Sequence, residues 1–151
     1  MDVHNIRLKV FCDQKALSAM KDSVSKMLPP DVVVEESVIE PEAEGGVFNE
    51  KLYVLTVFIK KKSDIRAFLN TLFSQMSVEG IQCLKSEVDL RTDEDCNFYV
   101  RLSKTALLDG GIKLCTEDSV HIKIKAAVYP SKKESAVEAI SRMLEETLEK
   151  R

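Results

Sequence analysis

The segment SVHIKIKAAVY, residues 119–129, alternates apolar and polar side chains almost without interruption. Successive side chains of a strand lie on opposite faces, so this alternation predicts a strand with one buried and one solvated face. The buried set is Val120, Ile122 and Ile124, and the solvated set is His121, Lys123 and Lys125. The chain is therefore expected to build a sheet that is covered on one face only.

Other segments are predicted strands as well. VHNIRLKVF at 3–11 has the same alternation, with Arg7 and Lys9 on the polar side. Further strands are expected at 31–39, at 97–103 and in IKLC at 112–115 after a Gly-Gly turn. Residues 51–60, KLYVLTVFIK, are apolar on both faces, which predicts a well-covered strand.

Apolar side chains at helical spacing predict helices near 14–28 and 64–76, a weaker short helix within 77–90, and a last helix after Pro130. The expected caps are Asp13, Ser63 and a capping box of Ser131 with Glu134. The order is β-α-β-β-α-(α)-β-β-β-α. We therefore predict an α+β fold, a mostly antiparallel twisted sheet with helices packed on one face, in a single RNA-binding-like domain, 1–151.

The formal net charge is −3, which taken alone argues against nucleic-acid binding. The distribution of the charges points the other way. The outward sets of four predicted strands contain cations and no acid; they are Arg7, Lys9, Arg101, Lys113, Lys123 and Lys125, joined by His121 and Tyr99. The acids concentrate at 40–50 and 87–95. One basic sheet face is predicted if the strands are neighbours, and otherwise the cations are ordinary solvated lysines and arginines.

Several classes of site lack their sequence patterns. There is no P-loop, G-x-G-x-x-G, G-x-S-x-G or H-E-x-x-H motif, so we expect no enzyme and no cofactor. The four cysteines form no C-x-x-C pair and are expected to be small buried residues, not metal ligands. No apolar run is long enough to span a membrane, and the N-terminal residues suggest a first strand and not a signal peptide. A cytoplasmic location without membrane contact is the expectation.

Four segments resemble an archaeal RNA-binding protein family whose members are predicted exosome-associated subunits. They are VHNIRLKVFC, IKKKSDIRAFL, DEDCNFYVRLSKTALLDGGIKL and VHIKIKAAVYPSKKESAVEAI. The most specific is the elbow RLSKTALLDGG at 101–111, in which Leu102, Lys104 and Ala106 match the family's usual form and the neighbouring residues depart from it. The resemblance implies a fold similar to that of the large-subunit ribosomal protein that contacts 5S rRNA.

We therefore predict a non-enzymatic RNA-binding protein that contacts the RNA backbone. The predicted contact residues are Arg7, Lys9, Arg101, Lys104, Lys113, Lys123 and Lys125, with Tyr99 and His121 touching bases or riboses. RNA is the expected partner, together with exosome or ribosome-related proteins. The alternative is a protein-interaction module that docks on an RNA-processing complex through its acidic loops.

Overall fold

A computed structural model describes residues 3–41 and 51–151. These residues form a five-stranded sheet in the order β2-β3-β1-β5-β4, with every neighbouring pair antiparallel. The strands are β1 (Val3–Cys12), β2 (Glu35–Ile39), β3 (Leu52–Ile59), β4 (Asn97–Ser103) and β5 (Ser119–Ala126). The predicted α+β class with an antiparallel sheet is confirmed.

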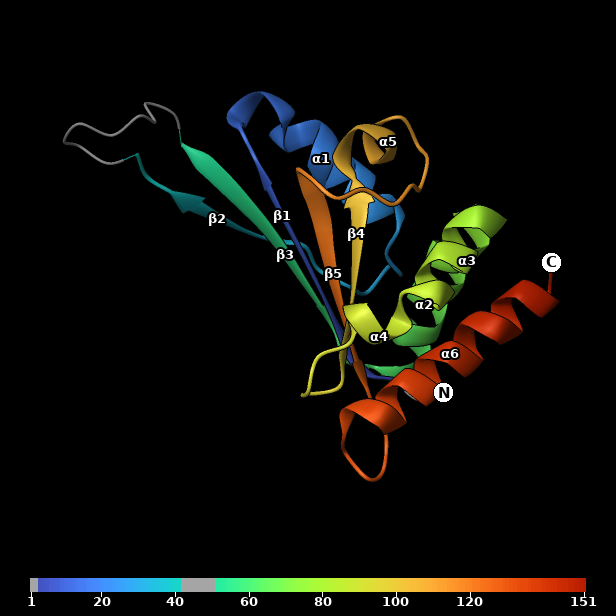
Figure 1. The fold of residues 1–151 in the computed structure, drawn as a ribbon. Coiled ribbons are helices and arrows are strands. Elements are labelled where there is room, and N and C mark those ends of the chain that lie inside the picture. The colour runs from blue at the N-terminus through green and yellow to red at the C-terminus, as the bar shows by residue number, and fades with distance from the viewer. Residues whose placement is uncertain (1–2, 42–50) are drawn as a thin grey trace.

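The helices are α1 (Gln14–Lys26), α2 (Lys62–Gln75), α3 (Val78–Ser86), α4 (Val88–Arg91), α5 (Lys104–Leu108) and α6 (Lys133–Glu149). Figure 1 shows α2, α3 and α6 grouped near one end of the sheet and α1 with α5 near the other. Within the described residues, no helix combines the length and the apolar character that crossing a membrane requires.

The core lies between the helices and one face of the sheet. Alternate strand residues are almost fully buried against the helices, and they include Ile6, Leu8, Ile122, Ile124 and Val100. Their neighbours in sequence point to the opposite face, where the charged side chains are exposed or half-buried. The alternation in the sequence therefore corresponds to one covered and one open sheet face, as predicted.

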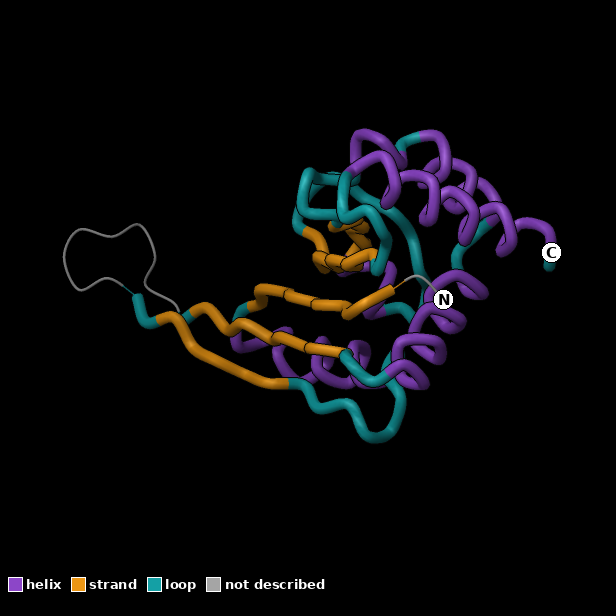
Figure 2. The backbone as a smooth tube through the Cα atoms, turned by 90° about the horizontal axis from the view of Figure 1, so that it is seen from below, coloured by secondary structure: helices purple, strands orange, loops and turns teal. Residues whose placement is uncertain are grey.

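The end of β2 and the beginning of β3, which pair with each other, extend beyond the helices (Figures 1 and 2). All five residues of β2 are exposed, because this edge strand lies beyond the helical layer. Leu52 and Phe58 of β3 are also exposed, at 38% and 41%. The expectation that residues 51–60 are covered on both faces is therefore wrong for these two positions.

The segment after β4 differs from the predicted element order. Residues 104–108 form the short helix α5, because the Ser103 hydroxyl accepts a hydrogen bond from the Ala106 amide at 3.1 Å and caps it. The segment IKLC is not a strand. Ile112 and Leu114 each make only an isolated bridge, to Met76 and Leu102 respectively. The predicted short helix within 77–90 is divided into α3 and α4 at Glu87.

The predicted caps have mixed outcomes. The Asp13 carboxylate accepts from the Ala16 amide at 2.9 Å, as expected for the start of α1. The predictions for Ser63 and for the Ser131–Glu134 capping box are wrong. α2 and α6 begin after Lys61 and Lys132, whose side chains make no capping bond. In each case the N-cap, which is the residue with extended backbone angles just before the helix, is a lysine and not the serine that residue type predicts.

Candidate nucleic-acid interface

The register of the three strands β1, β5 and β4 brings the outward cations together. Lys123 of β5 lies between Arg7 of β1 and Tyr99 of β4. The next row toward the other end of the strands consists of Lys9, His121 and Arg101. Because paired strands lie about 4.8 Å apart, side chains in one row are close neighbours on the surface. The strands are adjacent, as a single basic face requires.

A third row extends this surface at the opposite end. Lys125 lies between Asn5 and Asn97, and its ammonium donates to the carbonyl oxygen of Asp95 at 3.2 Å. We call these residues the basic sheet face: Arg7, Lys9, Tyr99, Arg101, His121, Lys123 and Lys125. Over the described ranges 3–41 and 51–151, the cations of this face make no ion pair. Their charges are available to a ligand.

His121 has a lowered pKa. Burial contributes most, because it disfavours the charged imidazolium, and the positive charges of Arg101, Lys104 and Lys9 add to the effect. The histidine therefore lies in a positive environment, which is the environment an anionic backbone would meet.

Tyr99 is held by an acid at the margin of the face. Its hydroxyl donates to Asp93 Oδ2 at 2.8 Å, and the residue is 38% exposed. Burial raises the pKa of Tyr99, and the bond to Asp93 raises it further. For Asp93, burial alone would raise the pKa, but hydrogen bonds from Asn97, Tyr99 and the Asp95 amide outweigh it and lower the pKa. Asp93 thus fixes the ring's position.

Lys104 is not free for a ligand. Its ammonium donates to Asp118 Oδ1 at 2.7 Å and to the carbonyl oxygen of Phe11, and its side chain is only 16% exposed. These contacts tie the start of α5 to β1 and to the segment before β5. The family-like elbow therefore has a structural use for its lysine.

Lys113 is exposed, but it lies beyond the last strand of the sheet. The Ser103 amide donates to the Lys113 carbonyl at 2.8 Å, and the next residue, Leu114, bridges to Leu102. These bonds hold residues 113 and 114 against the outer edge of β4. The structure thus brings together the cations of β1, β5 and β4, with Lys113 at their edge.

Sequence reasoning missed Phe58. This residue lies opposite Arg7 in the pairing of β3 with β1, so it belongs to the same sheet face. The Arg7 Cζ atom lies 4.3 Å from the centroid of the Phe58 ring, and Lys9 Nζ lies 5.5 Å from that of Phe11. The sequence did contain a signal. Residues 51–60 have apolar side chains at both odd and even positions, and in a strand one of these two sets must face the open side of the sheet.

Acidic groups border the basic sheet face. Glu35 of β2 lies opposite Thr56, which in turn lies opposite Lys9. A carboxylate therefore stands at the β2 edge of the sheet, in the same row as Lys9. In the segment 87–95, Glu87 pairs with Arg91 at 3.0 Å and Asp89 with Lys133 at 3.8 Å. These carboxylates already have partners within the chain. Most of the acidic loop predicted at 40–50 lies outside the described residues.

The cysteines and the possible metal ligands are dispersed. Cys12 and Cys96 are buried as expected, whereas Cys83 is exposed and Cys115 is half-buried, so the expectation of burial holds for two of the four. Across the described part of the chain, no group of three His, Cys, Asp or Glu residues is arranged to hold a metal ion.

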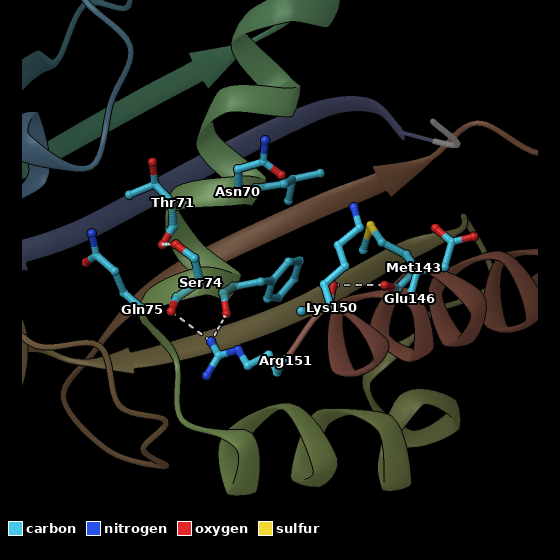
Figure 3. A pocket seen from close by; sticks show the side chains of 11 residues that line it. Asn70, Thr71, Ser74, Gln75, Met143, Glu146, Lys150 and Arg151 are labelled. Atoms are coloured by element: carbon cyan, nitrogen blue, oxygen red, sulfur yellow. Dashed lines mark hydrogen bonds between the residues drawn. The ribbon is translucent and has the colours of Figure 1, made fainter.

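A groove of about 470 Å³ lies on the helical side, between α2 and α6 (Figure 3). The Arg151 guanidinium closes one end of it by donating to the carbonyls of Ser74 at 2.8 Å, Met76 at 2.5 Å and Phe73. A cation at these carbonyls satisfies the otherwise unpaired acceptors at the end of α2. The groove is therefore part of the helix packing and is separate from the basic sheet face.

Comparison with known proteins connects this geometry to a family. Residues 5–128 match a protein family described as RNA binding. A relative from Pyrococcus abyssi (strain GE5 / Orsay), named RNA-binding protein PAB1135, is 32% identical over 151 residues, covering 96% of each chain.

Solved structures share the fold. Mth689, a DUF54 protein from Methanothermobacter thermautotrophicus, superposes with a TM-score of 0.75 at 25% identity, covering 95% of this chain and 99% of that one. Protein SSO0741 from Sulfolobus solfataricus gives 0.74 at 13% identity, covering 97% and 98%, which concerns the fold alone. The family match, which begins at residue 5, includes every residue of the basic sheet face. The chain belongs to this RNA-binding protein family.

Proposed function

We propose that this protein is a non-enzymatic RNA-binding protein whose basic sheet face contacts the RNA backbone. The observation that carries the proposal is the register of β1, β5 and β4, which aligns Arg7 with Lys123 and Lys9 with His121 and Arg101. Membership of an RNA-binding family supports the same function. Phosphate contacts of this kind give affinity and orientation with little sequence reading.

The acids at the border fit this proposal. Glu35, Asp93 and Asp95 lie around the cations and not among them. A phosphate backbone is attracted to the middle of the face and repelled at its margins, so the acids would confine the RNA to the strands β1, β5 and β4. Lys113 at the edge of β4 extends the contact surface. The lysine of the elbow, Lys104, is held by Asp118 and by the Phe11 carbonyl and is not part of this contact surface.

The test is a charge reversal on the sheet. The variant Lys9→Glu/Lys123→Glu/Lys125→Glu should bind RNA at least roughly 100-fold more weakly at 0.1 M salt, because three phosphate contacts become repulsive. Fluorescence anisotropy with a labelled RNA measures the affinity, and circular dichroism checks the fold.

A matched control reverses three exposed lysines elsewhere, Lys15, Lys26 and Lys132. It has the same net charge as the sheet variant and should bind like the wild type. Equal losses in both variants would mean that the net charge and not the sheet face governs binding. Unchanged affinity in the sheet variant would refute the assigned surface.

The resemblance to predicted exosome-associated subunits extends the proposal to partners. The protein would bring its RNA to exosome or ribosome-related proteins. A pull-down from an archaeal lysate, repeated after nuclease treatment, tests this extension. Partners that stay after nuclease would bind the protein directly, and partners that disappear would be held through RNA.

A further inference from the structure

An exposed aromatic residue, Phe58, lies beside the basic sheet face, and the packing of the core does not require a phenylalanine at this position. Phe58 of β3 is 41% exposed, although phenylalanine is usually buried. Its neighbours Val57 and Ile59 point into the core and are almost fully buried. Over the described residues, Phe58 is the large apolar side chain that contacts a cation of the face most closely, with Arg7 Cζ 4.3 Å from its ring centroid.

The ring belongs to a row that crosses four strands. Phe58 of β3 lies opposite Arg7 of β1, Arg7 opposite Lys123 of β5, and Lys123 opposite Tyr99 of β4. An aromatic residue thus stands at each end of the row and two cations lie between them. The three strand intervals separate the two ends by about 14 Å.

This arrangement matches the chemistry of unpaired RNA. Bases that are not paired offer flat faces to aromatic rings and to guanidinium planes, while their backbone offers phosphates to cations. A duplex keeps its bases stacked within the helix and presents mainly phosphates and riboses. Cations alone would serve either form of RNA, but exposed rings in line with them favour the unpaired form.

We propose that Phe58 and Arg7 form a stacking platform for an unpaired base, and that single-stranded RNA is the class of ligand that the basic sheet face binds. The inference rests on the proposed function and deepens it. Phe58 holds the guanidinium of Arg7 against its ring, so a base can stack on either group of the pair. Tyr99, whose hydroxyl is fixed by Asp93, offers the second ring of the row.

The test compares two RNAs and three variants. The probes are a labelled single-stranded oligonucleotide with 2-aminopurine at its centre and a hairpin duplex of equal charge, both titrated by anisotropy at several salt concentrations. The variants are Phe58→Leu, which keeps an apolar side chain, Phe58→Tyr, which keeps the ring, and Leu90→Ala as control. Leu90 is 84% exposed on α4, which packs on the helical side of β4.

The wild type should prefer the single strand and should quench 2-aminopurine on binding. Phe58→Leu should weaken single-strand binding by roughly 5- to 100-fold and abolish the quenching, since one stacked base is lost. Its salt slope and duplex affinity should stay unchanged, because no phosphate contact is removed. Phe58→Tyr and Leu90→Ala should behave like the wild type.

Three results would overturn the inference while leaving the proposed function intact. They are a wild type that binds the duplex at least as tightly, a Phe58→Leu variant with wild-type affinity and quenching, and equal losses for both RNAs. A Phe58→Leu variant that changes only self-association in light scattering would instead assign the ring to a second copy of the chain. A wild type that binds neither RNA in a salt-dependent way would refute the proposed function itself.

Discussion

His121 lies on β5, the middle of the three strands of the basic sheet face, between Lys9 and Arg101 on the two neighbouring strands. A histidine with an ordinary pKa of 6.5 would be partly charged in mildly acidic solution. Burial, followed by the adjacent cations, lowers this pKa, so the free protein keeps the imidazole neutral to lower pH. The unfolded chain then binds the proton more readily, and acidification through this range reduces the contribution of His121 to stability.

RNA binding should reverse this preference. A bound phosphate stabilises the imidazolium, so the complex takes up a proton and affinity should rise as the pH falls from 7.5 to 5.5. One additional charge contact steepens the log–log salt slope by about 0.7 on a single strand. Anisotropy at both pH values measures the change, and His121→Gln should lose most of it. An equal pH response in the variant would show that His121 does not contact the RNA.

At the scale of elements, the elbow RLSKTALLDGG connects β4 to α5 and the chain that follows. Ser103 caps α5, and the turn closes with a bond from the Gly111 amide to the Ala106 carbonyl at 2.8 Å. Gly110 has φ +87, a conformation that side-chain-bearing residues rarely adopt. Lys104 fastens this unit to β1 through the Phe11 carbonyl. The elbow is therefore a local brace for the end of the sheet.

The variant Lys104→Met tests this brace. It removes a charge-assisted contact to Asp118 and the bond to Phe11, so the free energy of unfolding should fall by about 1 kcal/mol, discounted because Asp118 is exposed. Urea denaturation measures this change. The salt slope of RNA binding should remain within error of the wild type. A slope that falls by about 0.7 would instead assign Lys104 to a phosphate, as the sequence alone predicted.

Elements differ in how well residue patterns predict them. The strands β1 and β5 follow from alternation, because a half-buried sheet imposes a period of two on every residue. The starts of α2 and α6 do not follow from residue type, since Ser63 and Ser131 lie beside the true starts and make no cap. α5 was missed because its five residues are too short for a helical period.

At the scale of the whole molecule, the chain has a net charge of −3 but carries a positively charged surface, the basic sheet face. Strand pairing gathers the cations on the open face, while partners such as Arg91 and Lys133 hold acids of the segment 87–95. The field near the sheet is therefore opposite in sign to the total charge. Association with RNA depends on this local field, because charges beyond about 10 Å are screened at 0.1 M salt.

This arrangement predicts a steep salt dependence in spite of the acidic composition. If about five cations of the face contact phosphates, log K plotted against log salt for single-stranded RNA should have a slope of about −3 to −4. Anisotropy titrations at salt concentrations between roughly 50 and 300 mM measure the slope, because the affinity changes strongly over this range. A slope near zero would show that the face contributes no phosphate contacts.

The sequence by itself determined which side chains point out of the sheet. Alternation placed Arg7, Lys9, Arg101, Lys123 and Lys125 opposite the core because burial is strictly periodic along a strand. Only the tertiary structure decided that their strands are neighbours, since strand order depends on long-range pairing that no local pattern records. The tertiary structure also placed Phe58 of β3 against Arg7 and bonded Lys104 to the Phe11 carbonyl of β1. These contacts join residues about 50 and 90 positions apart, so no local sequence pattern predicts them.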